Sequence, residues 1–176
     1  MFQKIVIVAV IVLLLFITIF AQERPGYYVQ GRYLFNPDGD LVVLRGVANP
    51  NIWFEKDGGT RYEEIAETGA NCVRIVWDTT GTASELDQAI SNCIDFEMIP
   101  MVECHDATGE WELLDEVVDY WTQPDIADVL ITYEEDLLLN IANECGDGTV
   151  LNSDFRTGYE AAITQIREAG IHVPLV

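Results

Sequence analysis

The stretch LLLNIANE, residues 137–144, decides how this chain is read. A run of leucines followed by alternating polar and small residues is typical of a buried parallel strand. Asn143 and Glu144 then stand at the carboxyl end of that strand, where α/β proteins keep their active sites because the strand-to-helix loops there are free to vary. The two residues could equally be a solvent-exposed turn with no catalytic role. The rest of the chain has to distinguish between these two interpretations.

Strand-like and helix-like segments alternate on both sides of this stretch. The predicted further strands are 41–47, 71–77, 98–104 and 171–176, and the predicted helices are 61–68, 84–96, 111–121, 126–131 and 155–169. Strand centres recur at about the length of a βα unit, which predicts a parallel α/β sheet, either doubly wound or a (β/α)8 barrel.

The residues after the first strand decide between these two architectures. They lack the glycine-rich fingerprint of a dinucleotide-binding fold, which favours the TIM-type barrel. A complete barrel takes about 250 residues. We therefore expect an incomplete one, with about strands 1 to 5, preceded by a β-hairpin at residues 28–43 whose turn is 36–39.

The first residues have the composition of a secretory signal peptide. Lys4 precedes an apolar run at 5–20, and Ala21 offers a small residue for cleavage. We expect a signal at 1–21, one domain at 22–176, and secretion with no membrane attachment after cleavage. A retained anchor is the alternative, although the run is shorter than the ~20 residues that a spanning helix needs.

Charge and cysteine content exclude some functions. The formal net charge is −21 and the basic residues are scattered, which disfavours binding to nucleic acid or to an anionic membrane. The cysteines Cys72, Cys93, Cys104 and Cys145 lack the paired spacing of a zinc site. Free buried thiols are favoured, and Cys93 with Cys104 is the one pair to test for a disulfide.

Polar residues stand at the carboxyl ends of successive predicted strands. They are Arg74, His105, Asn143 and Glu144. In a barrel these ends converge on one mouth, so residues far apart in sequence become neighbours. Arg74 alone could be a structural ion-pair partner and His105 a strand cap, but the placement of all these residues in register favours a functional site.

At these residues the chain resembles a known enzyme family. The matching motifs are LVVLRGV from Leu41, GANCVRIVW from Gly69, VECHDATG from Val102, VVDYW from Val117, LLLNIANE from Leu137 and GYEAAITQIREAGIHVPLV from Gly158. They resemble the secreted β-mannanases and cellulases of glycoside hydrolase family 5, and most closely the bacterial endo-β-1,4-mannanases. The resemblance implies hydrolysis of internal β-1,4 linkages with retention, without metal or cofactor, on mannan or less favourably on glucan or another β-linked hexose polymer.

The resemblance also implies roles for the residues at the mouth. It assigns the proton donor to Glu144, the amide that holds the sugar to Asn143, and the arginine that orients the nucleophile to Arg74. His105 is implied to line the subsite where the bond is cut. A strand-end glutamate in a partly desolvated mouth can have its pKa raised for the acid role.

The second carboxyl group is the difficulty. Retaining glycosidases need two carboxyl groups about 5 to 5.5 Å apart, and in the family the nucleophile lies on the seventh strand. Glu103 shares its strand parity with His105 but matches a supporting position. We therefore expect this chain to be catalytically incomplete.

Other residues differ from the family or extend its site. Asn49 and Asn51 stand where relatives have histidines, and residues 145–148 replace a bulky aromatic. Sugar-stacking faces are expected at Trp53, Trp77 and Trp111, whereas Trp121 is expected in the core.

These departures keep two further interpretations open. The first is a non-catalytic carbohydrate-binding or assembly protein derived from such an enzyme, which the asparagines and the absent nucleophile favour. The second is self-association, because open sheet edges invite strand pairing.

Overall fold

The computed structural model describes residues 26–176. The signal peptide expected at 1–21, and the alternative of a retained anchor, lie outside these residues. Within them, no helix combines the length and the apolar character needed to cross a membrane.

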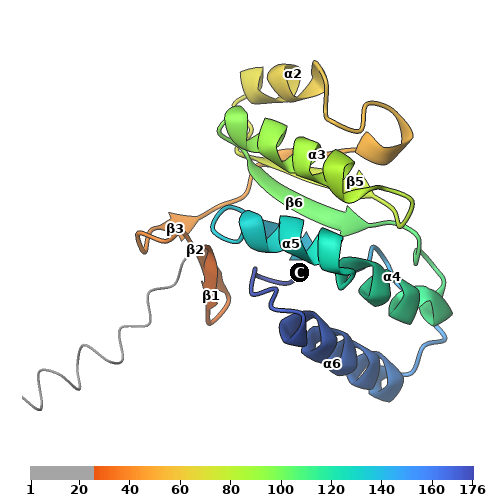
Figure 1. Cartoon of the computed structure of the whole chain (residues 1–176). Coiled ribbons are helices and arrows are strands. Elements are labelled where there is room, and N and C mark those ends of the chain that lie inside the picture. Colours follow the sequence, from red (N-terminus) through yellow and green to blue (C-terminus); the bar gives the residue numbers. More distant parts are fainter. Residues whose placement is uncertain (1–25) are drawn as a thin grey trace, which may run out of the picture.

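The N-terminal hairpin is part of a small antiparallel sheet. Its strands β1 (Tyr28–Gln30), β2 (Tyr33–Phe35) and β3 (Leu41–Val42) lie in that order. The expected turn closes between β2 and β3, where the Gly39 amide donates to the Asn36 carbonyl at 3.0 Å. Figure 1 shows this sheet to one side of the helices.

The predicted strand 41–47 is two strands, which corrects the sequence reading. Its first residues belong to β3, and β4 (Gly46–Asn49) starts a second sheet. The side chain of Asn71 explains the break, because its amide nitrogen donates to the Val43 carbonyl at 3.0 Å and its oxygen accepts from the Arg45 amide at 2.7 Å. These backbone groups are therefore satisfied without a ladder.

The second sheet is parallel, as expected. It contains β4, β5 (Cys72–Trp77), β6 (Ile99–Cys104) and β7 (Leu138–Asn140) in that order. The predicted strand 171–176 is reduced to a single bridge between Leu139 and Leu175. Pro174 accepts from the Leu139 amide at 3.0 Å but has no N–H to extend the ladder. The barrel is therefore not closed by the described residues.

Helices connect these strands. They are the 3₁₀ turns η1 (Asn51–Trp53) and η2 (Trp111–Leu113) and the helices α2 (Arg61–Glu67), α3 (Ala83–Asp95), α4 (Leu114–Trp121), α5 (Pro124–Thr132) and α6 (Asn152–Glu168). Helices α3 and α5 lie side by side on one face of the parallel sheet, with β6 visible between them (Figure 1). Helix α3 is capped by Thr82, which forms a reciprocal capping box with Glu85.

Strand alternation fixes which side chains face the helices. On β5, Val73, Ile75 and Trp77 are fully buried in the core with Leu86 and Ile90 of α3. Arg74 has the opposite parity and therefore lies on the face of the sheet that turns away from the helices. This alternation turns a polar side chain of β5 out of the apolar core.

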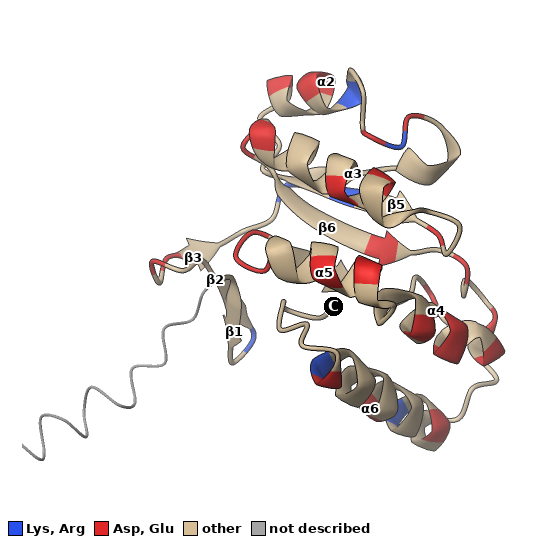
Figure 2. Cartoon of the chain, in the orientation of Figure 1, with Lys and Arg blue, Asp and Glu red and all other residues tan. Residues whose placement is uncertain are grey.

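Acidic residues outnumber basic ones in the described part of the chain. They are distributed along the helices and loops, with few basic residues among them (Figure 2). The expected core position of Trp121 is confirmed, since it is fully buried.

The cysteines are free and buried, as the sequence favoured. Burial raises the pKa of the Cys72 thiol to about 11 and that of Cys93 to about 12. Thiols of such high pKa are poor nucleophiles near neutral pH.

Candidate active site

A buried carboxylate stands at the centre of the site. The side chain of Glu103, near the end of β6, is fully buried. Its Oε1 lies 3.4 Å from Nη1 of Arg74 and 2.9 Å from Nδ1 of His105. Its Oε2 has no hydrogen-bond partner among the described residues. Glu103 therefore joins the arginine of β5 to the histidine that follows β6.

Burial dominates the acidity of Glu103. It raises the pKa of this carboxyl group, while the hydrogen bond from His105 and the charge of Arg74 act in the opposite direction. The cation beside it is what makes an ionised carboxylate tolerable at this depth.

The amide of Asn143 is held at both ends. Its Oδ1 accepts a 2.6 Å hydrogen bond from Nη2 of Arg74, and its Nδ2 donates to Oγ1 of Thr108 at 2.8 Å. An arginine can only donate, so Oδ1 has to face it and the amide orientation is determined. Among residues 26–176, the second hydrogen of Nδ2 has no acceptor, so it can be offered to a ligand.

Glu144 follows in a strained backbone conformation. Its φ is +39°, in the left-handed region that non-glycine residues rarely occupy. Its carbonyl accepts from the Gly109 amide at 2.9 Å, which ties this turn to the loop after β6. The side chain is exposed and has no partner among residues 26–176. It borders an open hollow of about 570 Å³ that is also lined by Asn140 and Tyr159.

The tryptophans predicted to stack on sugar differ in their exposure to solvent. Trp53 is 55% exposed and meets the His105 ring edge to face at 5.1 Å between centroids, so it remains a candidate for stacking. Trp77 is fully buried, and its Nε1 donates to the Tyr120 hydroxyl at 2.7 Å. Its predicted sugar-stacking role is wrong, because its parity on β5 turns it toward the helices.

Trp111 packs against α6, on residues that also line the hollow beside Glu144. Its ring stacks on Phe155 at 5.9 Å and meets Tyr159 at 6.2 Å, both on α6. It is half-buried there, and its role in sugar binding stays a prediction.

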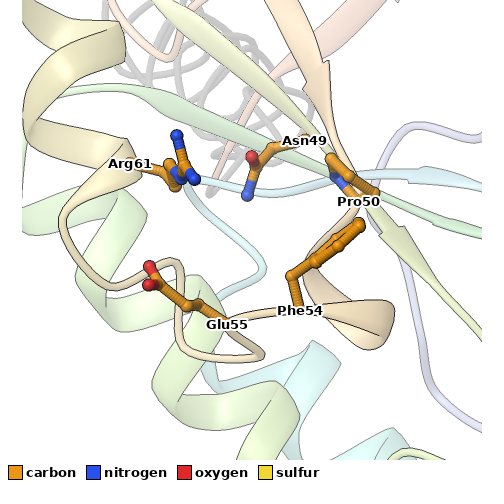
Figure 3. Close-up of a pocket in the computed structure, with 5 residues that line it drawn as sticks. All are labelled: Asn49, Pro50, Phe54, Glu55 and Arg61. Atoms are coloured by element: carbon orange, nitrogen blue, oxygen red, sulfur yellow. The ribbon is translucent and has the colours of Figure 1, made fainter.

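A second hollow, of about 520 Å³, opens beside η1. Pro50 and Phe54 lie on one side of it, with Arg61 and Glu55 on the other (Figure 3). Phe54 is 78% exposed. The hollow therefore has an exposed aromatic side chain on one side and a charged pair of residues on the other.

Asn49 and Asn51, which the resemblance places where relatives have histidines, have a structural role. Asn51 is fully buried, and its Nδ2 donates to the Tyr62 hydroxyl at 2.9 Å and to the Lys56 carbonyl at 3.1 Å. Its Oδ1 accepts from Asn49 at 2.8 Å. These contacts hold the loop that carries Trp53.

The structure thus brings together Arg74, His105 and Asn143, with Glu144 next along the chain. Sequence reasoning missed the central position of Glu103, although its shared parity with His105 was a usable signal. It also missed Thr108, for which the sequence has no signal beyond its place in the loop after β6. Within residues 26–176, no cluster of His, Cys, Asp or Glu is arranged to hold a metal ion.

Proteins of similar sequence and fold are mannan-degrading enzymes. The chain is 35% identical over 153 residues to a mannan endo-1,4-β-mannosidase of Salipaludibacillus agaradhaerens and 34% identical over 155 residues to one of Cellvibrio japonicus. The structure of the Thermomonospora fusca β-mannanase in complex with mannohexaose matches with a TM-score of 0.78 and 31% identity, covering 85% of this chain. Over the matched part of its length, this chain is similar to β-mannanases.

The resemblance to β-mannanases inferred from the sequence is confirmed. The match covers 83% and 82% of this chain but only 49% and 35% of the two mannosidases, and 53% of the T. fusca β-mannanase. The chain therefore spans about half the length, or less, of the mannanases that it matches. No protein-family model matches it.

Proposed function

We propose that this chain is the N-terminal part of the (β/α)8 catalytic domain of a secreted endo-β-1,4-mannanase that acts with retention. The observation that carries the proposal is the contact between Arg74 and Asn143, which holds the amide next to the exposed Glu144. The parallel order β4-β5-β6-β7 supports the barrel. The names of its relatives support mannan as the substrate.

The proposed reaction begins with binding at the carboxyl ends of the strands. Asn143 offers its free amide hydrogen to a sugar hydroxyl, and Trp53 offers an apolar face to a sugar ring. Glu144 then donates a proton to the leaving glycosidic oxygen, and as a carboxylate it later activates water to release the sugar. Its exposed side chain is accessible for both steps.

The nucleophile has to come from another carboxylate. Glu103 is unsuitable, because it is fully buried and its Oε1 is occupied by Arg74 and His105. Its other oxygen, Oε2, has no hydrogen-bond partner among the described residues but is buried, so a sugar carbon cannot reach it. We propose that the second carboxylate belongs to a segment of the protein beyond Val176.

The test compares the 176-residue chain with a version extended through the missing strands. The reducing-sugar assay on mannan should show turnover only in the extended protein, and Glu144→Gln should abolish it there. Turnover by the shorter chain would contradict the proposed need for a further carboxylate.

A non-catalytic carbohydrate-binding protein is the second candidate. The structural use of Asn51, in place of a histidine at the cleavage site, favours it. It predicts mannohexaose binding that survives Glu144→Gln and no turnover by the extended protein. Calorimetry on the same variants separates it from the enzyme.

Self-association is a related proposal. The outer edge of β4 is exposed, and Val47 on it is 46% exposed, which leaves backbone groups ready to pair with another strand. Sedimentation analysis decides it, because a monomer at all concentrations would exclude pairing through this edge.

A further inference from the structure

The imidazole of His105 is held between a buried acid and the open mouth of the site. Its Nδ1 lies 2.9 Å from Oε1 of Glu103. Its Nε2 has no partner among the described residues, and the side chain is 30% exposed. One ring nitrogen is therefore committed to the protein interior and the other is free to meet a ligand.

The second partner of Oε1 decides which atom carries the proton in this contact. Nη1 of Arg74 lies 3.4 Å from the same oxygen, and a guanidinium can only donate. If Oε1 carried a proton, it could donate to Nδ1 of His105 but would accept less well from Nη1 of Arg74. Oε1 therefore acts as a hydrogen-bond acceptor toward both groups. The hydrogen in the 2.9 Å contact then belongs to Nδ1 of the histidine.

We infer that Glu103 is a positioning residue for His105: whenever the imidazole is uncharged, Glu103 selects the Nδ1–H tautomer, which presents Nε2 to the mouth as a hydrogen-bond acceptor. The partner of one ring nitrogen sets the role of the other. A bare Nε2 accepts a hydrogen bond, so it favours a ligand hydroxyl that donates one. In the opposite tautomer Nε2 would carry the hydrogen and would favour a ligand oxygen that accepts one.

The chemical class of ligand follows from the neighbouring groups. Asn143 contributes a free N–H donor, His105 an acceptor, and Trp53 an aromatic face 5.1 Å from the imidazole. Paired donors and acceptors beside an aromatic face suit a polyhydroxylated ring. This use of the tautomer rests on the proposed function, but the tautomer itself does not.

The chain is well suited to a direct test, because it has only two histidines. His172 is exposed and serves as an internal reference. Two-bond ¹⁵N–¹H correlation spectra of the ¹⁵N-labelled 176-residue chain at pH 8, without sugar, report which nitrogen of each imidazole is protonated. His172→Gln assigns the two sets of signals.

We expect His105 to show a protonated Nδ1 and a bare Nε2, a pattern that differs from that of His172. Glu103→Gln should keep this pattern, because the amide oxygen still accepts, whereas Glu103→Leu should lose it. Trp53→Leu is the matched control and should leave it unchanged, since it alters packing on the ring but not its hydrogen bond.

A proton on Nε2 of His105 in the unaltered chain would overturn the inference, and so would its persistence on Nδ1 in a folded Glu103→Leu variant. If Glu103→Leu does not fold, the test relies on the unaltered chain, Glu103→Gln and Trp53→Leu. A change of tautomer in Trp53→Leu would then show that packing on the ring, and not Glu103, sets the tautomer. Failure of the mannan assay would leave all these results standing, so the two proposals fail separately.

Discussion

Arg74 donates a 2.6 Å hydrogen bond from Nη2 to Oδ1 of Asn143, which lies 69 positions further along the chain. The same guanidinium lies 3.4 Å from the buried carboxylate of Glu103. One side chain on β5 therefore fixes groups at the ends of β6 and β7, and the site depends on it for its charge balance.

Removal of the guanidinium should destabilise the protein. Arg74→Met leaves Glu103 buried without its cation, and breaking a buried pair in this way costs about 3 kcal/mol. Urea unfolding measures the loss. Arg61→Met is the control, because the Arg61–Glu64 pair is exposed and worth about 0.5 kcal/mol. Equal effects of the two substitutions would show that Arg74 does not balance a buried charge.

Stability should depend on pH through Glu103. Because burial raises the pKa of this acid in the folded state, its contribution is complete below the unfolded value near 4.5 and is lost as the pH rises through the folded value. The unfolding free energy of the unaltered chain should therefore fall relative to Glu103→Gln over that window. Urea midpoints at successive pH values measure it, and a constant difference would contradict the assignment.

The capping box of α3 should give the stability of the protein the opposite dependence on pH. Hydrogen bonds from the Thr82 backbone, Lys56 and the Thr82 hydroxyl lower the pKa of Glu85 to about 2. Its contribution is therefore present above the unfolded value near 4.5 and is lost as the pH falls toward 2. The stability difference between the unaltered chain and Glu85→Gln should shrink over that range. A difference that grows on acidification would reverse this account.

Removal of the Tyr120 hydroxyl, which contacts Trp77, should lower the stability of the core. The Tyr120 hydroxyl accepts from Trp77 and donates to the Gly81 carbonyl at 2.9 Å, and all these groups are buried. Tyr120→Phe leaves a buried donor and acceptor unpaired, at a cost of about 2 to 4 kcal/mol.

The matched control for this substitution is Tyr133→Phe. It removes only an exposed hydrogen bond to Asp87 and should cost less than about 1 kcal/mol. Thermal unfolding compares the two variants, and similar melting temperatures would argue against a buried network.

Trp53 should contribute to sugar binding under the proposed function. Trp53→Ala removes an aromatic face worth about 1 kcal/mol, so the dissociation constant for mannohexaose should rise about fivefold. Phe96→Ala provides the control, because Phe96 is a partly exposed aromatic that caps the end of α3. Isothermal calorimetry measures both, and a matching loss in the control would remove the special role of Trp53.

Much of this fold follows from local patterns. The leucines of residues 137–139 and the alternation on β5 are dictated by burial, so the strands were predictable from sequence. The helix predicted from residue 84 begins at Ala83 after its cap Thr82, and the pattern misleads here because Ser84 offers the same capping side-chain chemistry two residues later. The division of residues 41–47 into two strands depends on Asn71, whose contacts with Val43 and Arg45 arise only in three dimensions.

The site was predictable to a similar extent. Arg74, His105 and Asn143 meet because parallel strands end together, which sequence order already implies. Trp77 stands at the carboxyl end of the predicted strand 71–77, but strand parity turns its ring into the core. The linking role of Glu103 depends on interatomic distances, and no pattern of residue types specifies these.

The left-handed backbone at Glu144 has a practical consequence for engineering. Among residues 26–176, only Glu97 and Glu144 have positive φ without being glycine, and glycine at either position should release about 1 kcal/mol of strain. Selection for heat resistance alone would accept both replacements, yet at 144 it would discard the carboxylate. A thermostabilisation programme should therefore vary position 97 and keep position 144 fixed.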